Sequence, residues 1–348
     1  MFIYWYIWAT IVVMNLVNLP KNKGGEIFLF IFSAFIFIFI GGRFEVGGDW
    51  FSYLYIFDLY KADSFFKVAG SSEYGYGFFN WLAHQLNYSI SFVNFVCAFC
   101  LIIGFYQLSR RFEHLFLAFL IAFSYTIIAV GMGYTRQSAA IGLVCYAFST
   151  LFAQNPKKWK FFVWISFAYL FHKSAIIFLA FLPLINSKFY KNKIFYLYSL
   201  FVILFSFYII YMISQGESAY TSGELSSAGA VFRIALHLLP IAVYLWQRHI
   251  FVESYPNTYR LLDLMCILIL IFLPVSFVYS TIADRFNLYF VIFDVVVFGK
   301  FFEYLKSFEL KALFLIALII ENTMLFFIWI NYSPYALCCF DYRNVLFM

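Results

Sequence analysis

Long apolar runs separated by short polar connections recur along the whole chain. Three of the clearest are residues 194–213, 259–279 and 312–330. A helix that crosses a membrane needs about 20 such residues, because each adds about 1.5 Å and the hydrocarbon core is about 30 Å thick. The runs do not alternate between apolar and polar positions, as barrel strands do. The pattern therefore predicts an all-α polytopic membrane protein.

The length and interruption of each run predict about twelve transmembrane helices. We expect them at 1–19, 26–41, 88–108, 114–131, 137–153, 159–171, 174–187, 194–213, 233–247, 259–279, 288–302 and 312–331. The first run has neither a basic start nor a cleavage pattern of small residues, so we expect it to be retained. Because no internal repeat or linker is visible, we expect one transmembrane domain, 1–348.

Composition supports this reading. Hydrophobic residues make up 65% of the 348 residues and charged residues only 11%. Soluble domains carry about 25% charged residues, so an ordinary soluble enzyme is excluded. Four cysteines lie inside apolar runs and fit small apolar packing, and the lone C-x-x-C at 97–100 has no second ligand pair, so we expect no zinc site.

Basic residues divide between the two predicted faces of the membrane. One face carries Lys21, Lys23, Arg110, Arg111, Lys157, Lys158, Lys160, Lys188, Lys191, Lys193, Arg248, Arg260, Lys300, Lys306 and Lys311. The positive-inside rule makes this face cytoplasmic. Both termini, the longest loop, 42–87, and a second loop, 214–232, are then outside.

The outer face is richer in arginine than the cytoplasmic face. It carries Arg43, Lys61, Lys67, Arg136, Lys173, Arg233, Arg285 and Arg343. A planar guanidinium with several fixed donors suits the binding of phosphate or carboxylate. Position adds to this, because Arg136, Arg233 and Arg285 each stand near an outer helix boundary.

Two outer segments combine glycine with arginine, and the first of them also carries acidic residues. In the first loop, Arg43 could bind an anion while Asp49 or Glu73 bonds sugar hydroxyls; an ion pair that merely holds the loop is the alternative. Arg136 opens the fifth span, where a helix N-terminus favours a negative ligand. Its alternative is an interfacial anchor whose head group reaches water.

His172 joins two short predicted spans, and their junction is expected below the outer surface. Lys173 and the following helix N-terminus disfavour imidazolium, which leaves a neutral ring able to accept a proton. A packed histidine is the alternative. Late in the chain, Asp284 could orient Arg285, and Asp294 and Glu321 within apolar spans could be functional or simple helix contacts.

These motifs, in this order, resemble the EpsG-type polysaccharide polymerases, relatives in role of the Wzy O-antigen polymerases. The matching positions are Gly41, Arg43, Gly47, Asp49 and Tyr53; Glu73, Gly75 and Tyr76; Gly133, Arg136, Gln137 and Ala140; and His172 to Ala175. Asp284, Arg285, Phe286 and Tyr289 are similar to the final arginine element of the family. A second glycine, Gly48, before Asp49 is a minor difference.

The resemblance implies a GT-C-like membrane glycosyltransferase of polysaccharide or lipopolysaccharide biosynthesis. It would transfer a growing glycan from undecaprenyl pyrophosphate to a sugar hydroxyl of a new lipid-linked repeat. The implied location is the bacterial inner membrane, with the active face periplasmic. The implied partners are the lipid-linked donor and acceptor, membrane lipids and a chain-length regulator, with no nucleic acid and no cofactor beyond the lipid carrier.

On this basis we expect His172 or Asp49 to take the hydroxyl proton, without a metal. The expected pyrophosphate ligands are Arg43, Arg136, Arg233, Arg285 and Arg343. The expected glycan ligands are Tyr53, Glu73, Tyr134, Gln137, Lys173 and Asp284.

Two other functions fit parts of the pattern. A flippase or transporter of lipid-linked glycans would also have many spans, but it should show repeat symmetry and functional groups near the midplane. A membrane O-acyltransferase would also use a histidine base, and would need a path for its acyl donor.

Overall fold

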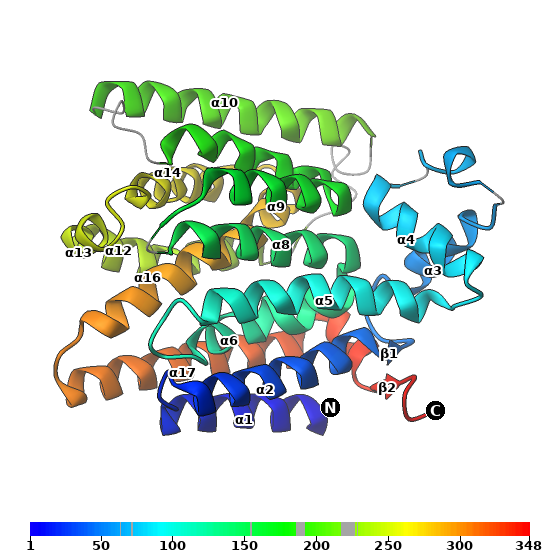
Figure 1. Ribbon diagram of the computed structural model, residues 1–348, viewed down its shortest axis with the longest axis horizontal. Coiled ribbons are helices and arrows are strands. Elements are labelled where there is room, and N and C mark those ends of the chain that lie inside the picture. The colour runs from blue at the N-terminus through cyan, green and yellow to red at the C-terminus, as the bar shows by residue number, and fades with distance from the viewer. Residues whose placement is uncertain (63, 71, 154, 186–191, 217–226, 228) are drawn as a thin grey trace.

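The computed structural model describes residues 1–62, 64–70, 72–153, 155–185, 192–216, 227 and 229–348. The described chain is mostly helical, and its long helices run roughly along one direction (Figure 1). The first part contains α1 (Phe2–Val17), α2 (Lys23–Gly41), α3 (Trp50–Leu59), η1 (Phe65–Lys67), α4 (Tyr74–Gln85), α5 (Ile90–Ser109), α6 (Leu117–Ala122), η2 (Phe123–Val130), α7 (Gly131–Gly133), α8 (Thr135–Leu151), α9 (Lys158–Phe171) and η3 (Lys173–Leu184).

The second part continues with α10 (Asn192–Gly216), α11 (Ala230–Leu236), α12 (Leu238–Trp246), α13 (Arg248–Ser254), α14 (Tyr259–Val275), α15 (Ser280–Asn287), η5 (Leu288–Phe290), α16 (Val291–Tyr304), α17 (Phe308–Tyr332) and η6 (Pro334–Cys339). Two short strands, β1 (Arg43–Phe44) and β2 (Arg343–Asn344), pair antiparallel.

A helix lies at each of the twelve predicted segments, and the prediction of an all-α protein is confirmed. Among the described residues, α2, α5 and α17 are long and apolar enough to cross a membrane, and α11–α12 with α13, bent by 72°, would be a fourth such span. The count of twelve crossings and the GT-C-like architecture stay predictions. Of the predicted outer loop 214–232, residues 217–226 and 228 lie outside the described part, as do Lys188 and Lys191.

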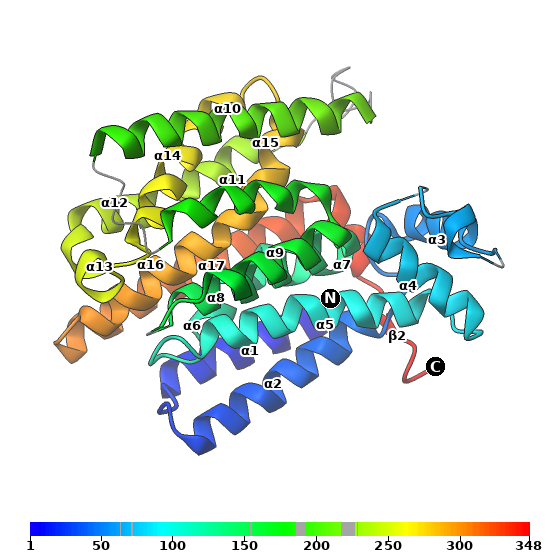
Figure 2. The same cartoon turned by 45° about the horizontal axis from the view of Figure 1, so that its top comes forward.

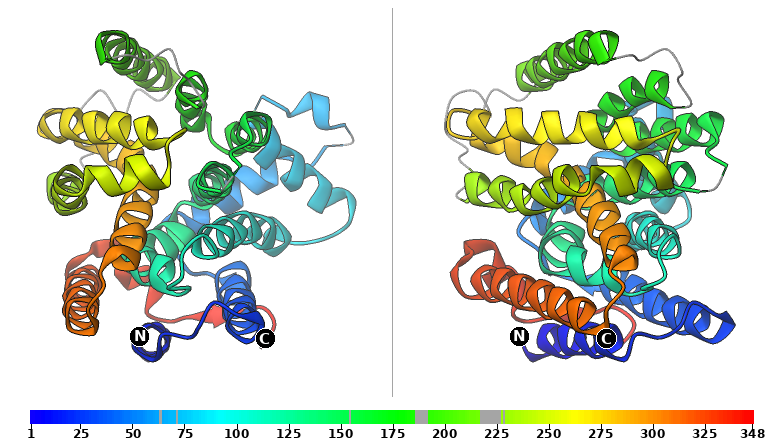
Figure 3. Two further views of the ribbon diagram at one scale, coloured as in Figure 1. Left: turned by 60° about the vertical axis from the view of Figure 1, so that its left-hand side comes forward. Right: turned by 90° about the vertical axis from the view of Figure 1, so that its left-hand side faces the viewer.

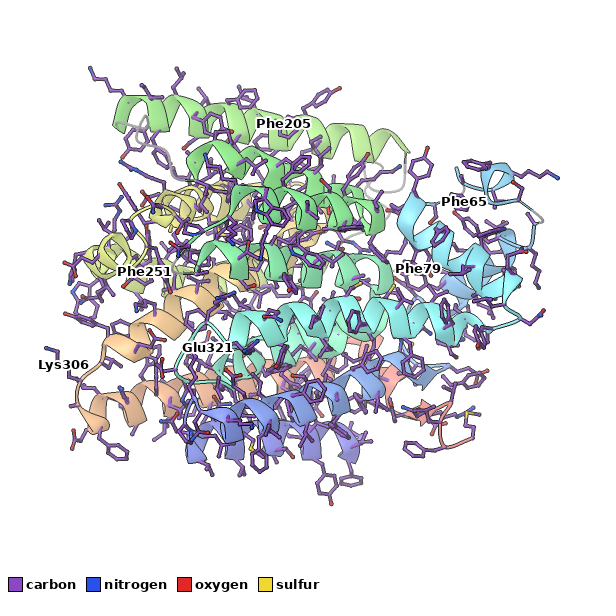
Figure 4. The ribbon with its side chains drawn as sticks, viewed as in Figure 1. Phe65, Phe79, Phe205, Phe251, Lys306 and Glu321 are labelled. Carbon is purple, nitrogen blue, oxygen red and sulfur yellow. The ribbon has the colours of Figure 1, made fainter. Side chains whose placement is uncertain are left out.

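The first predicted outer loop, 42–87, contains the helices α3 and α4. Each is about 15–18 Å long at 1.5 Å per residue, too short to cross a bilayer, so each buries one face instead. Trp50, Tyr53 and Phe57 of α3 are buried. Figure 2 shows both helices at one end of the bundle, and Figure 4 shows Phe65, between them, at the end opposite Lys306.

The C-terminus lies at the same end as α3 and α4, and the N-terminal end of α1 is directed toward that end (Figure 1). The terminal ammonium of Met1 donates to the carbonyl of Phe340 at 3.0 Å. Strand β2 pairs with β1 in a register that sets Arg43 opposite Asn344. We call this the outer end, following the charge pattern, which predicts that both termini and loop 42–87 share one side of the membrane.

Helix α8 is the most enclosed helix of the bundle. Every residue of it except Arg136 and Tyr146 is buried, and Figure 3 shows other helices around it. Its most extensive neighbour is α5. The two backbones meet at Gly104 and Gly142, where a side chain on either residue would overlap backbone atoms of the other helix. Small residues that let helices approach closely are typical of membrane bundles.

The α5–α8 contact can be tested with Gly104→Ala. The added methyl group would meet the Gly142 carbonyl, and overpacking of this kind costs about 1–3 kcal/mol. We expect a lower Tm for the purified protein in detergent. The control is Gly70→Ala, because nothing lies within 4 Å of the corresponding position. Equal Tm values for the two variants would contradict the contact.

Candidate functional site

The loop between β1 and α3 is held against the start of α8 by a glycine. Gly47 has a φ of 111°, which only glycine adopts readily, and a Cβ there would overlap the Met132 carbonyl oxygen. Its amide also donates to the carbonyl of Cys338 at 3.2 Å. Because Gly47 lies so close to Met132, Asp49, which is two residues later, lies at the outer end of α8.

Asp49 lies in the electrostatic field of two arginines. Burial raises the pKa of its carboxyl group, while the nearby charges of Arg285 and Arg136 act to lower it. Within the part of the chain that the structure describes, no side chain or backbone group bonds or ion-pairs with this carboxylate. An acid that is partly buried near two cations, without a direct partner, is typical of a functional group.

Arg136, the second residue of α8, forms an ion pair with Glu73. Its Nη1 donates to Oε2 of Glu73 at 2.7 Å, and the two side chains are 25% and 10% exposed. The guanidinium also lies over the ring of Tyr53, 5.8 Å from its centroid. Its Nε is buried and has no hydrogen-bond partner among the described residues. Arg136 is therefore oriented by two elements of the outer loop.

Arg285 of α15 is bonded to α8 by a reciprocal pair of hydrogen bonds. Its Nη1 donates to Oε1 of Gln137 at 3.1 Å, and Nε2 of Gln137 donates to the Arg285 carbonyl at 2.6 Å. The guanidinium stacks on Tyr134, 4.1 Å from the ring centroid. Because Arg136 and Gln137 are consecutive, this contact brings the two arginines to the same end of α8.

His172 lies between α9 and η3 and begins a chain of hydroxyl groups. Its Nδ1 is 2.6 Å from Oγ of Ser174, which in turn is 2.9 Å from the hydroxyl of Tyr289. Burial lowers the pKa of His172 well below its usual value, and the charges of Arg136, Arg285 and Lys173 lower it further. The ring is therefore neutral near pH 7, and it lies near the same two arginines as Asp49.

The tautomer of His172 follows from its neighbours. The amide N–H of Ser174 also points to Nδ1, at 3.4 Å. An amide can only donate, so Nδ1 is favoured as an acceptor, and the proton of the neutral ring then lies on Nε2. In this tautomer Nε2–H is a hydrogen-bond donor rather than a base.

Arg233 and Asp284 form a second, bidentate pair close to this site. Nε and Nη2 of Arg233 donate to the two carboxylate oxygens, each at 2.8 Å, and the guanidinium lies over Tyr125 at 4.9 Å. Ser227 donates to the same carboxylate at 2.7 Å. The sequence suggested that Asp284 orients its neighbour Arg285, but this bidentate partner of Asp284 is Arg233. Asp284 and Arg285 point differently because successive residues of a helix do not face each other.

The structure places the other sequence-predicted residues around or away from this site. Arg43 is 2% exposed, and its guanidinium donates to Ile40, Asn94 and Thr135, which ties β1 to α5 and α8. Arg343 is exposed and pairs with Glu45 and Asp341. Lys173 is exposed beside His172. These contacts give Arg43 and Arg343 structural partners, and their expected roles as pyrophosphate ligands stay untested predictions.

Asp294 and Glu321 lie within helices, away from the outer end. Asp294 of α16 lies 2.7 Å from Nδ1 of His237, and Glu321 lies part-way along α17 (Figure 4). The described cysteines form no disulfide. Among the residues described, no group of three or more His, Cys, Asp or Glu is placed to hold a metal ion.

Several groups of the site have no role in the prediction from the sequence. Ser174 and Tyr289 extend the His172 chain, and Tyr125 covers Arg233. The first two belong to the motifs quoted above, so the signal was present. Tyr125 lies in an apolar run with nothing to distinguish it from the other 27 tyrosines of a chain with 28.

Fold and site together define a helical membrane protein with two oriented arginines, an acid that has no direct partner among the described residues, and a neutral histidine at one end. The model of the EpsG family matches residues 26–344, and the chain belongs to this family. It is thus a polymerase-like membrane protein of polysaccharide biosynthesis, with the character of a membrane glycosyltransferase. Neither a curated protein nor a solved structure matches it significantly.

The Arg136–Glu73 pair can be tested with Glu73→Gln. Removing one partner of a poorly exposed ion pair leaves the other charge uncompensated. The loss of stability is about 3–5 kcal/mol when the pair is fully buried, so we expect a clear decrease in Tm. Limited proteolysis between α3 and α4 should also accelerate.

The matched control is Glu45→Gln. Glu45 pairs with Arg343 at 3.0 Å, but both side chains are nearly half exposed, and exposed pairs contribute about 0–1 kcal/mol. Equal effects of the two substitutions would show that Arg136–Glu73 does not anchor α4.

Proposed function

We propose that this protein polymerises polysaccharide repeats at the outer face of a bacterial inner membrane. It transfers a growing glycan from undecaprenyl pyrophosphate to a hydroxyl group of a new lipid-linked repeat. The observation that supports this most is the convergence of Asp49 with Arg136 and Arg285 at one end of α8. A chain-length regulator remains a proposed partner.

The two arginines suit a pyrophosphate leaving group. Negative charge develops on that group as its bond to the sugar breaks, and donors held in place beforehand stabilise it most. Glu73 and Tyr53 hold Arg136, while Gln137 and Tyr134 hold Arg285. The proposed glycan ligands Tyr53, Glu73, Tyr134 and Gln137 therefore act mainly through the arginines.

Asp49 is the better candidate for the base. Its carboxylate has no direct partner among the described residues, and burial raises its pKa, which strengthens it as a proton acceptor. His172 has its Nδ1 engaged by Ser174 and is neutral. We assign its Nε2–H to donate a hydrogen bond to the departing pyrophosphate.

In the proposed step, one bond forms at the anomeric carbon and one breaks. The acceptor hydroxyl oxygen forms a bond to the anomeric carbon of the donor glycan, and its proton passes to Asp49. The bond from that carbon to the pyrophosphate oxygen breaks, and the electron pair leaves with undecaprenyl pyrophosphate. Arg136, Arg285 and His172 stabilise the new charge, and Asp49 later releases its proton to water.

Purified protein in proteoliposomes, given a defined undecaprenyl-pyrophosphate-linked repeat, tests the proposal. We expect a ladder of glycan lengths on a gel. Movement of the repeat across the bilayer without any ladder would instead support a transporter. Failure to extend the repeat, with protein shown to be folded, would overturn the polymerase proposal.

The role of Asp49 predicts a pH dependence. A base works only when ionised, so the rate should fall about tenfold per pH unit below its pKa, which burial raises above the usual value of about 3.9. Asp49→Asn should lose about 10²–10⁴-fold in rate, and Asp49→Glu should stay active with a displaced acid limb. A profile that is unchanged in Asp49→Glu would remove Asp49 from this role.

The role of His172 predicts a difference between two substitutions. Gln retains an N–H donor and Ala does not, so His172→Gln should keep more activity than His172→Ala, which loses about 10²–10³-fold if one oxyanion donor disappears. Initial rates of ladder formation measure this. Equal losses in the two variants would point to proton transfer by the ring instead.

A further inference from the structure

An apolar groove runs along the outside of α9 and η3. It has a volume of about 340 Å³, and its lining includes Phe162, Ser166, Phe167 and Leu170 of α9 and Ile176 and Leu179 of η3. The hydroxyl group of Ser166 donates a hydrogen bond to the carbonyl of Phe162 at 2.9 Å, so its polarity is satisfied within the helix. The groove therefore offers a surface that favours a hydrocarbon chain.

The length of the groove along α9 is close to the thickness of one membrane leaflet. From Phe162 to Leu170 is about 12 Å along a helix at 1.5 Å per residue, and half of a hydrocarbon core is about 15 Å. Its upper end, which is the end nearest the outer end of the bundle, is formed by Leu170. Leu170 is two residues before His172, so the Cα atoms of the two residues are at most about 7 Å apart. A chain lying in the groove would thus lead directly to the polar site.

Helix α4 joins the upper end of the groove to the arginines. Its Gly75 lies so close to Leu170 that a Cβ would be 2.8 Å from the Cβ of that residue. Phe79 stacks on Phe171, with ring centroids 5.9 Å apart. Glu73, which precedes the helix, binds Arg136. The same short helix therefore contacts both the apolar groove and the cationic site.

We propose that this groove holds the first isoprene units of the donor's tail, with its pyrophosphate at the head of the groove beside His172. This rests on the proposed function. Lys173, which is exposed and directly follows His172, adds a positive charge near this end and complements an anionic headgroup. A groove that is apolar along a leaflet and cationic at its outer end fits a tail attached to a pyrophosphate.

Photocrosslinking tests the proposal without any turnover. The probe is a C55 polyprenyl pyrophosphate with a diazirine on an isoprene unit near the headgroup and no glycan, added to wild-type protein in nanodiscs. We expect mass spectrometry to locate adducts within 158–184. Adducts spread evenly over other lipid-facing helices would overturn the proposal. It would also be overturned if phosphatidylglycerol reduced crosslinking as effectively as unlabelled C55 pyrophosphate does.

A matched pair of variants adds an affinity test. Ser166→Trp fills the groove and should weaken C55 pyrophosphate binding about tenfold or more, equivalent to about 1.4 kcal/mol, while binding of inorganic pyrophosphate, which has no chain, changes little. Leu204→Trp, on the exposed face of α10, should bind as wild type. Equal affinity in the two variants would contradict the proposal.

The result is independent of the polymerase assay. Adducts in the groove without any glycan ladder would keep the lipid site and reject the proposed reaction. A ladder with adducts elsewhere would keep the reaction and reject the groove.

Discussion

The ion pair between Arg136 and Glu73 sets the geometry of the outer end. Helix α8 is buried at fifteen of its 17 positions and carries one charged residue, at its outer end. A guanidinium in such surroundings is costly unless a carboxylate compensates it. Glu73 supplies that carboxylate at 2.7 Å, so α4 must dock where α8 begins. The position of α4 then fixes its contacts with Leu170 and Phe171 of α9.

The charged residues at the outer end differ in whether they have a direct partner. Arg136 and Arg233 face carboxylates, and Arg285 is bonded to Gln137 and stacked on Tyr134. Asp49 lies in the field of Arg136 and Arg285 without a direct partner among the described residues. Structural acids are usually satisfied by a near neighbour, so an acid left open beside oriented cations fits our proposal of a base next to a bound pyrophosphate.

The helices could be predicted from the sequence because burial in a membrane requires long apolar runs, and helices occur at all twelve predicted positions. The motifs also indicated Asp49, Arg136, His172 and Arg285. Pairings could not be predicted, because they depend on side-chain direction and packing. Arg43 and Arg136 both follow glycines by a few residues, yet one is buried against neutral acceptors and the other meets Glu73. The short helices α3 and α4 were missed because their apolar faces are too short for a span.

The central claim is that the outer end of α8 is an anion site between Arg136 and Arg285. A cryo-electron microscopy structure of the protein in nanodiscs with undecaprenyl pyrophosphate tests it most directly. The account predicts pyrophosphate density in contact with both guanidinium groups and near His172, with Asp49 facing the open side. Density bound at the opposite end of the bundle, or held by Arg43 or Arg343 away from Arg136, would contradict it.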